Sequence, residues 1–280
     1  MDARSFQNLI HQLQHKERCW EAMLELKFVT QKDRYPDIIH ALTHPHSLVR
    51  WVMAEHCGEL CLQKSADLLF QLLLDTDPQV RKTAYKALKS MSTSILPCVI
   101  THLDHPQVGI RKVAHHLLLT CKEDALDALK DSLPTHGFFV QQRLLNLIWK
   151  ISPFKCEAIL FNVLDLPAVE QHAILYLGQL KSKKAIQPLL KKYEQPNCRS
   201  FILAAFEQIG ADHVYPIIAK SLVHPALETQ ALCLAKTIGS PLLPYIQACV
   251  SGIGSDQKQT WQNVISKLKN IDRARVHGLY

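Results

Sequence analysis

The sequence predicts an all-α protein, an α-solenoid of about nine stacked antiparallel helix pairs. The first observation is a short motif that recurs at a near-constant spacing: Leu48-Val49-Arg50, Gln79-Val80-Arg81 and Gly109-Ile110-Arg111. Its arginines lie 31 and 30 residues apart, and the same apolar pattern follows each one. The second observation is composition, because 9 glycines and 14 prolines in 280 residues leave few tight turns for an all-β chain. We therefore expect one repeat array over residues 1–280.

Counting from the arginine position carries the register through the chain. The equivalent positions, here numbered zero, are Arg50, Arg81, Arg111, Gln141, Glu170, Arg199, Glu228 and Gln257. Around each of the first seven, apolar or small residues occupy positions −1, +3, +7 and +10, which lie on one face of an α-helix. We call this helix B of each repeat and expect its striped face to form the core.

A shorter apolar helix, A, is expected before each B helix, at 35–42, 64–74, 95–103, 124–133, 156–164, 184–193, 212–222 and 241–251. Polar turns with proline, such as Thr43-His44-Pro45, separate A from B, because proline suits the first turn of a helix and not its interior. Gly210 and Gly239 follow B helices as expected C-terminal caps. Residues 4–15 and 18–29 predict the first pair, 257–270 the last B helix, and 271–280 a short basic tail.

Residues 73–88, with the sequence LLDTDPQVRKTAYKAL, closely resemble a HEAT repeat. The period near 30 resembles the short subtype of phycobilisome lyases and many bacterial proteins. The resemblance implies a solenoid in which the zero-position arginine pairs with turn acids near Asp75 and Asp77. It does not imply one activity, since HEAT arrays serve as scaffolds, transport receptors, lyases and DNA-repair enzymes. Three later repeats replace that arginine with Gln141, Glu170 or Glu228.

Composition and charge restrict the class of protein. The chain has no apolar run long enough to span a bilayer, and its start lacks the layout of a signal peptide. Nine scattered cysteines, several at core positions, are typical of reduced thiols inside a cell. The net charge of +7 comes from the second half, since residues 1–140 carry 16 basic and 16 acidic side chains. We expect a cytoplasmic monomer with acidic partners.

The resemblance also indicates where a ligand binds, because B helices line the concave side of HEAT-like arrays. The outward stripe of helix B lies at positions +1, +5 and +8. Its candidate binding residues are Trp51, Glu55, Lys82, Lys86, Lys89, Lys112, His116, Gln142, Asn146 and Trp149. Five basic side chains, counting His116, lie on two adjacent helices, with a tryptophan one repeat away on each side. Exposed aromatics around a cationic centre are typical of binding hot spots, although a lysine-rich face is often only solvated.

Three classes of function are compatible with this surface. The first is a non-catalytic scaffold that holds an acidic segment of another protein. The second is nucleic-acid binding, with or without base excision. HEAT-like alkylpurine DNA glycosylases hold a flipped base with an aromatic and a carboxylate, as Trp51 and Glu55 could here. The third is a chromophore lyase or chaperone, like relatives of the same repeat subtype.

Histidine is abundant, at 15 residues, and several histidines and cysteines have spacings compatible with metal ligands. His11 and His15 are four apart, which suits two ligands on one helix. A second group lies on both sides of one turn and consists of His102, His105 and the pair His115-His116. A third group, within six residues, consists of His56, Cys57 and Cys61. Each group also has an ordinary structural interpretation. HEAT-like deoxyhypusine hydroxylases need several His-Glu pairs, and this chain has only the reversed Glu55-His56. With no nucleophile motif or phosphate loop either, we expect no catalytic residues, metal or cofactor.

Overall fold

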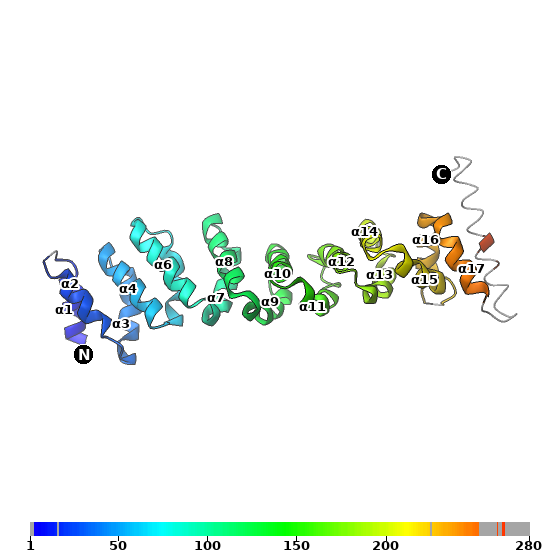
Figure 1. Ribbon diagram of the computed structural model, residues 1–280. Coiled ribbons are helices and arrows are strands. Elements are labelled where there is room, and N and C mark those ends of the chain that lie inside the picture. Colours follow the sequence, from blue (N-terminus) through cyan, green and yellow to red (C-terminus); the bar gives the residue numbers. More distant parts are fainter. Residues whose placement is uncertain (1–2, 16, 225, 252–261, 263–264, 267–280) are drawn as a thin grey trace. The chain divides into compact units, whose positions relative to one another are not determined.

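The structure is a computed structural model that describes residues 3–15, 17–224, 226–251, 262 and 265–266 (Figure 1). Over these residues it is helical and contains no strand, which confirms the all-α prediction. Two compact units divide the chain, residues 1–152 and 153–280. The single array over 1–280 stays a prediction, and the expected tail and most of the expected last B helix lie outside the described residues. None of the described helices has the length and apolar character needed to cross a membrane.

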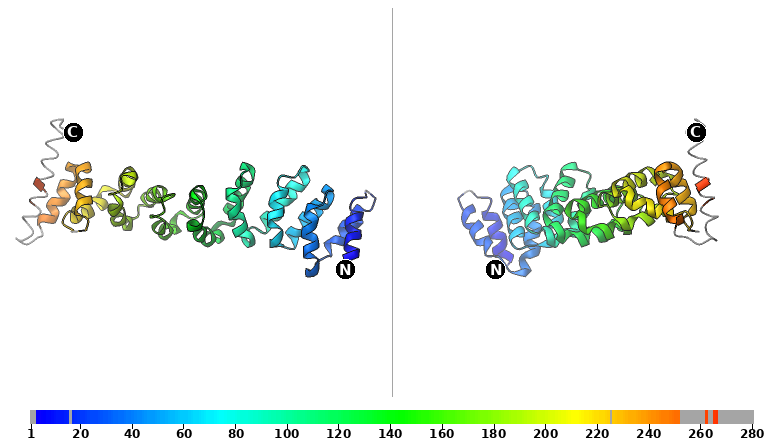
Figure 2. Two further views of the ribbon diagram at one scale, coloured as in Figure 1. Left: turned by 180° about the vertical axis from the view of Figure 1, so that it is seen from behind. Right: turned by 45° about the vertical axis from the view of Figure 1, so that its right-hand side comes forward.

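The first unit consists of consecutive helix pairs, which Figures 1 and 2 show stacked one after another. Its A helices are α1 (Ala3–Gln12), α3 (Tyr35–His40), α5 (Ala66–Leu72), α7 (Leu96–Thr101) and α9 (Leu126–Ser132). Its B helices are α2 (Cys19–Lys27), α4 (Ser47–Glu59), α6 (Pro78–Ser90), α8 (Val108–Cys121) and α10 (Phe138–Ile151). The A helices are shorter than expected, because short 3₁₀ turns such as η2 (Ala41–Thr43) and η5 (His102–Asp104) take over their last residues.

The second unit repeats this pattern. Its A helices are α11 (Glu157–Asn162), α13 (Ile186–Lys192), α15 (Ala211–Ser221) and α17 (Leu243–Ser251), and its B helices are α12 (Glu170–Gln179), α14 (Arg199–Ile209) and α16 (Glu228–Ile238). Gly210 and Gly239 follow α14 and α16 with φ of 100° and 77°, which confirms both predicted caps. Cys61, Lys122 and Lys181 occupy the same +11 position in other repeats, with φ of 50–52°. Positive φ at position +11 therefore does not depend on glycine, although Ser92 and Ser152 at the same position in two other repeats lack it.

The predicted core register is confirmed in both units. All residues at −1, +3 and +7 of the seven repeats from Arg50 to Glu228 are buried, and Val80, Ala84 and Leu88 show the pattern at 0% exposure each. Position +10 lies at the edge of the core, where Leu60 and Ile151 are half-buried. One face of each B helix thus supplies most of the apolar contact with its neighbours.

Arginine at position zero closes the turn that precedes its own helix. Arg50 donates to the backbone oxygens of His44 (2.8 Å) and Pro45 (2.7 Å), which terminate the preceding A segment. Arg81, Arg111 and Arg199 make the same pair of bonds to the residues six and five positions earlier. Each arginine therefore satisfies carbonyl groups that the end of a short helix leaves unpaired.

Position zero also joins one repeat to the next. Arg50 forms a bidentate ion pair with Asp75 of the following turn, at 2.7 and 2.8 Å, as the HEAT resemblance implies. In the second unit the charges are exchanged, because Glu170 occupies position zero and Lys192 of the following repeat lies 3.5 Å from its carboxylate. The substitution of arginine in this later repeat thus keeps an ion pair at the junction.

Candidate functional site: a groove and basic surface on the B helices

An open groove of about 360 Å³ lies between α4 and α6. Trp51, Glu55 and Glu59 line it from α4, and Lys82 and Lys86 line it from α6. The spacing of one helical turn, from +1 to +5, sets Trp51 beside Glu55 and Lys82 beside Lys86. The structure therefore brings four of the sequence-predicted residues into one groove and adds Glu59, which the sequence did not single out.

Glycine forms the floor of this groove. A Cβ atom on Gly58 would lie 2.9 Å from the Cα atom of Ala87 on α6, so the two helices approach as closely as their backbones allow. Gly58 occupies position +8, which the sequence predicts to face outward, yet it is buried. That assignment was wrong in this repeat, because the absent side chain lets the next helix cover the position.

The two walls of the groove carry opposite charge. Glu55 is half-buried and the Glu59 side chain is 51% exposed, whereas Lys82 and Lys86 are both exposed. Across the described chain, neither lysine forms an ion pair with a carboxylate. The α6 wall therefore presents positive charge that the fold itself does not use.

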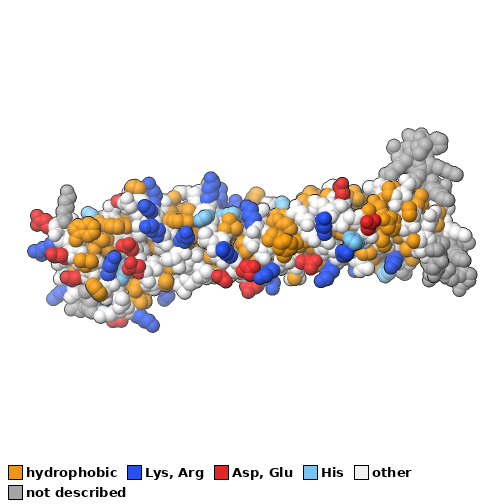
Figure 3. Space-filling view, in the orientation of Figure 1, with side chains coloured by type: hydrophobic (Ala, Val, Ile, Leu, Met, Phe, Trp, Pro, Cys, Tyr) orange, Lys and Arg blue, Asp and Glu red, His pale blue; other side chains and the backbone are white. Residues whose placement is uncertain are grey.

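The positive charge continues from α6 to α8. Lys89 is exposed on α6, and Lys112 and His116 are exposed on α8. The ring centroids of Tyr85 and His116 lie 6.3 Å apart, so these side chains of α6 and α8 meet. Figure 3 shows basic side chains along the upper edge of this segment. We call Lys82, Lys86, Lys89, Lys112 and His116 the basic surface.

The electrostatic environment beside the basic surface disfavours further positive charge. Burial lowers the pKa of His115, and the nearby charges of Lys150 and His116 lower it further. His115 is half-buried next to exposed His116 on α8. The His115 side chain is therefore held toward its neutral form.

The tryptophans differ from their expected exposure. Trp51 and Trp149 are half-buried, so the expectation of two exposed tryptophans was wrong. A large ring on a packed helix lies against its neighbours, and Trp51 does so inside the α4–α6 groove. Gln142 and Asn146 are likewise half-buried on α10. Neither these two residues nor Trp149 lines the groove.

Comparison with known families places this site inside a recognised repeat segment. A model described as HEAT repeats matches residues 35–119, from α3 to the last turns of α8. Residues 35–119 are HEAT repeats. The groove and the basic surface therefore lie on a repeat scaffold. No curated protein sequence matches the chain.

Solved structures similar to the chain include two HEAT-like proteins of different activity. Human deoxyhypusine hydroxylase is 16% identical over 87% of this chain and 94% of its own, with a TM-score of 0.32. The complex of CpcE and CpcF of phycocyanin lyase from Nostoc sp. PCC7120 is 17% identical over 87% and 94%, with a TM-score of 0.33. An engineered protein is 13% identical over 99% and 93%, with a TM-score of 0.29. At such values neither activity transfers to this chain.

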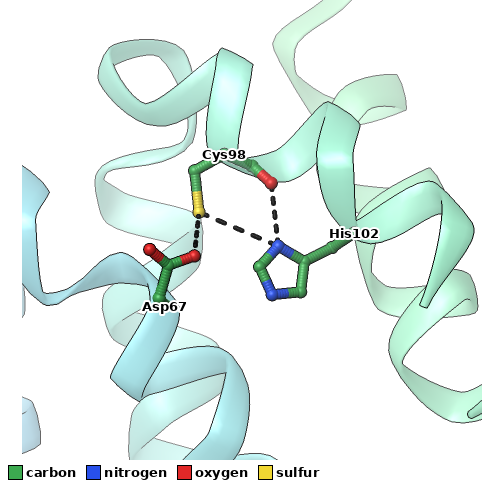
Figure 4. A group of neighbouring side chains, drawn as sticks. All are labelled: Asp67, Cys98 and His102. Carbon is green, nitrogen blue, oxygen red and sulfur yellow. Dashed lines mark hydrogen bonds between the residues drawn. The ribbon is translucent and has the colours of Figure 1, made fainter. Parts of the chain in front are cut away.

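Sequence reasoning missed a second cluster in the HEAT segment, formed by Asp67, Cys98 and His102 (Figure 4). The Cys98 thiol donates to the Asp67 carboxylate at 3.2 Å and lies 3.8 Å from His102 Nδ1. Burial raises the pKa of Cys98 to about 12, with Asp67 adding to the shift, so this thiol keeps its proton at neutral pH. Cys98 and His102 lie four apart, and Asp67 lies 31 residues, about one repeat, before Cys98. These two spacings are the features of the sequence that could have indicated the cluster.

The other histidine and cysteine groups have structural roles or lie on an open surface. The buried His56 ring bonds to the Val29 carbonyl oxygen at 2.8 Å, and burial raises the pKa of Cys57 to about 12. The rings of His11 and His15 lie 4.8 Å apart beside an open hollow at the start of the chain. His56 and Cys57 therefore have a structural role in the core, as the sequence analysis allowed.

Proposed function

We propose that this protein is a non-catalytic binding scaffold that recognises an acidic protein segment on the face of α6 and α8, which the sequence predicts to be concave. The observation that supports this is the basic surface, whose four lysines are exposed and form no ion pair with any described residue. Carboxylates of a partner would supply the missing counter-charges. We expect the protein to act as a monomer in the cytoplasm, a reducing compartment that suits its nine free cysteines.

The groove beside the basic surface favours a protein segment over a nucleic acid. Glu55 and Glu59 line the groove opposite Lys82 and Lys86, and their negative charge repels a continuous phosphate backbone. A peptide varies its side chains along its length. It can place acidic residues over α6 and α8 and an apolar residue against Trp51. The carboxylates of α4 thus limit where the acidic part of the partner lies.

The test exchanges the charge of the basic surface. Lys82→Glu, Lys86→Glu and Lys112→Glu together should reduce partner capture at least tenfold, because attraction is replaced by repulsion. These side chains are exposed and lie off the packing face, so the melting temperature should change little. The measurement is affinity purification from the native host with quantitative mass spectrometry. Any residual binding should depend less on salt than binding by the unmodified protein.

A matched control makes the same change of charge elsewhere in the first unit. Lys32, Lys64 and Lys130 are exposed and lie on A helices or 3₁₀ turns. Their triple change to Glu should leave capture intact. Trp51→Ala should weaken binding through lost contact area, with its salt dependence unchanged. Equal capture by both triple variants would contradict the proposal, and steep salt-dependent binding of duplex DNA would favour the nucleic-acid alternative.

A further inference from the structure

Asp67, Cys98 and His102 converge from two successive repeats. Asp67 lies on α5, Cys98 lies on α7, and His102 begins the 3₁₀ turn η5 that follows α7. Figure 4 shows the three side chains pointing toward one another. Their ligand atoms all lie within 4.8 Å of one another. Cys98 and His102 are half-buried and Asp67 is exposed, so solvent reaches the cluster.

The distance between Cys98 and Asp67 is close to the ligand spacing of a small metal ion, and His102 lies near both. Cys98 Sγ lies 3.2 Å from Asp67 Oδ1 and 3.8 Å from His102 Nδ1. A tetrahedral ion with bonds of about 2.3 Å to sulfur and about 2.0–2.1 Å to nitrogen or oxygen separates its ligand atoms by about 3.3–3.6 Å. Both separations that involve His102 need to shorten, and the exposed Asp67 side chain has room to rotate.

The imidazole of His102 is held in place before any ligand binds. Its ring stacks on Phe70 at 3.8 Å between centroids and 11° between planes, and Phe70 is 1% exposed. His102 Nδ1 also lies 2.8 Å from the Cys98 carbonyl oxygen. With Nδ1–H donated to this carbonyl, Nε2 is the nitrogen left to bind the ion, an arrangement common in metal-binding histidines.

The order of the three groups distinguishes metal binding from catalysis. A nucleophilic relay places the histidine between the nucleophile and the acid. Here the thiol lies between the carboxylate and the imidazole and contacts both. A shared central thiol suits a thiolate ligand of a metal ion, and thiolate, imidazole and carboxylate together are zinc ligands.

We propose that Asp67, Cys98 and His102 bind a zinc ion that ties α5 to α7, with the Cys98 proton released to solvent as the thiolate binds the metal. This proposal departs from the sequence-based expectation of no metal. It concerns the A helices and is independent of the basic surface on the B helices. Three protein ligands leave one position for water, so the site should bind zinc less tightly than a closed site with four protein ligands.

Cobalt(II) titration of the reduced full-length protein tests the proposal. A thiolate bound to cobalt gives a charge-transfer absorption that aqueous cobalt and unbound thiols lack. We expect this band to saturate at one equivalent and to disappear on addition of zinc. Cys98→Ser should abolish the band, and Asp67→Asn and His102→Gln should each weaken cobalt binding at least about tenfold.

Cys61→Ser is the matched control, because Cys61 is an exposed thiol of the same unit outside the cluster. Cys61→Ser should keep the cobalt band, and zinc should raise its melting temperature as it does for the unmodified protein. Cys98→Ser should lose both the band and the rise in melting temperature. Asp67→Asn changes an exposed side chain, so a folded variant is available whatever Cys98→Ser does to stability. A missing band in the unmodified protein, a band of full size in folded Cys98→Ser, or unchanged cobalt affinity in folded Asp67→Asn would overturn the proposal.

Discussion

Glycine at position +8 sets the distance between successive B helices at one junction in each unit. A Cβ on Gly58 would lie 2.9 Å from Ala87 Cα, and one on Gly178 would lie 2.6 Å from Ala205 Cα. Both neighbours are backbone atoms, which cannot rotate away as a side chain can. These two residues therefore decide how closely α4 approaches α6 and α12 approaches α14.

Gly58→Ala and Gly178→Ala should each lower the free energy of unfolding by about 1–3 kcal/mol, because the added methyl group forces the helices apart. Gly109→Ala is the matched control in α8. A Cβ there meets nothing within 4 Å, so better helix propensity should raise stability by about 0.5–1 kcal/mol. Urea unfolding of the three variants measures the difference. A stabilising Gly58→Ala would show that α4 and α6 are not in close contact.

At the scale of elements, Asp75 couples α4 to the turn before α6. The side chains of Arg50 and Asp75 are 14% and 5% exposed, so the pair is shielded from water. Asp75 also accepts a bond from the Asp77 amide at 2.9 Å. By contrast, the Asp77 side chain caps α6 by accepting from the Gln79 amide at 2.8 Å and bears no ion pair with any described residue.

Asp75→Ala should therefore lower the free energy of unfolding by about 2–3 kcal/mol, since it leaves Arg50 without its partner. Asp77→Ala should cost only about 1 kcal/mol, the usual value of a helix cap. Hydrogen bonding from Arg50 holds the pKa of Asp75 below its ordinary value of 3.8. Its stabilisation is thus complete above pH 3.8 and is lost as the pH falls below it.

Urea unfolding at neutral pH and in acid measures both effects. The unmodified protein should lose more stability below pH 3.8 than Asp75→Ala does, because the variant has no carboxylate to protonate at this junction. Equal costs for Asp75→Ala and Asp77→Ala at neutral pH would mean that the ion pair does not couple the repeats.

The B helices could be predicted because their core face recurs over about three turns, so one misplaced residue does not shift the register. The A helices span six to eleven residues, and short 3₁₀ turns adjoin several of them. The expected helix at 64–74 is only Ala66–Leu72, because a 3₁₀ turn (Gln63–Ser65) takes its first residues and Leu73 already caps its end. The lysines of the candidate site followed from the same periodicity. The partial burial of Trp51 and the contact of Asp67 with Cys98 depend on distances between repeats, which periodicity within one repeat does not give.

At the scale of the whole molecule, equivalent positions of the repeat keep their structural role when their residues change. Position zero is arginine at the Arg50 junction and glutamate at Glu170, and each forms an ion pair with the following repeat. The cap at +11 is glycine in two repeats and cysteine or lysine in three others, with positive φ in all five. The repeats therefore share structural roles at fixed positions and need not share residues. We expect the free energy of unfolding to depend on the number of complete repeats.

Deletion of one complete repeat tests this. Removal of residues 111–140 joins Ile110 to Gln141, so a −1 residue still precedes a zero-position residue. Leu147 then replaces Leu117 at position +6, and both are 0% exposed leucines. The junction with α6 should therefore repack with the same side chain, and the protein should keep its helical circular dichroism per residue and a cooperative melting transition. Removal of residues 111–125, half a repeat, joins helix B of one repeat to helix A of the next out of register. That variant should lose the cooperative transition, and equal melting curves for the two deletions would contradict the repeat register.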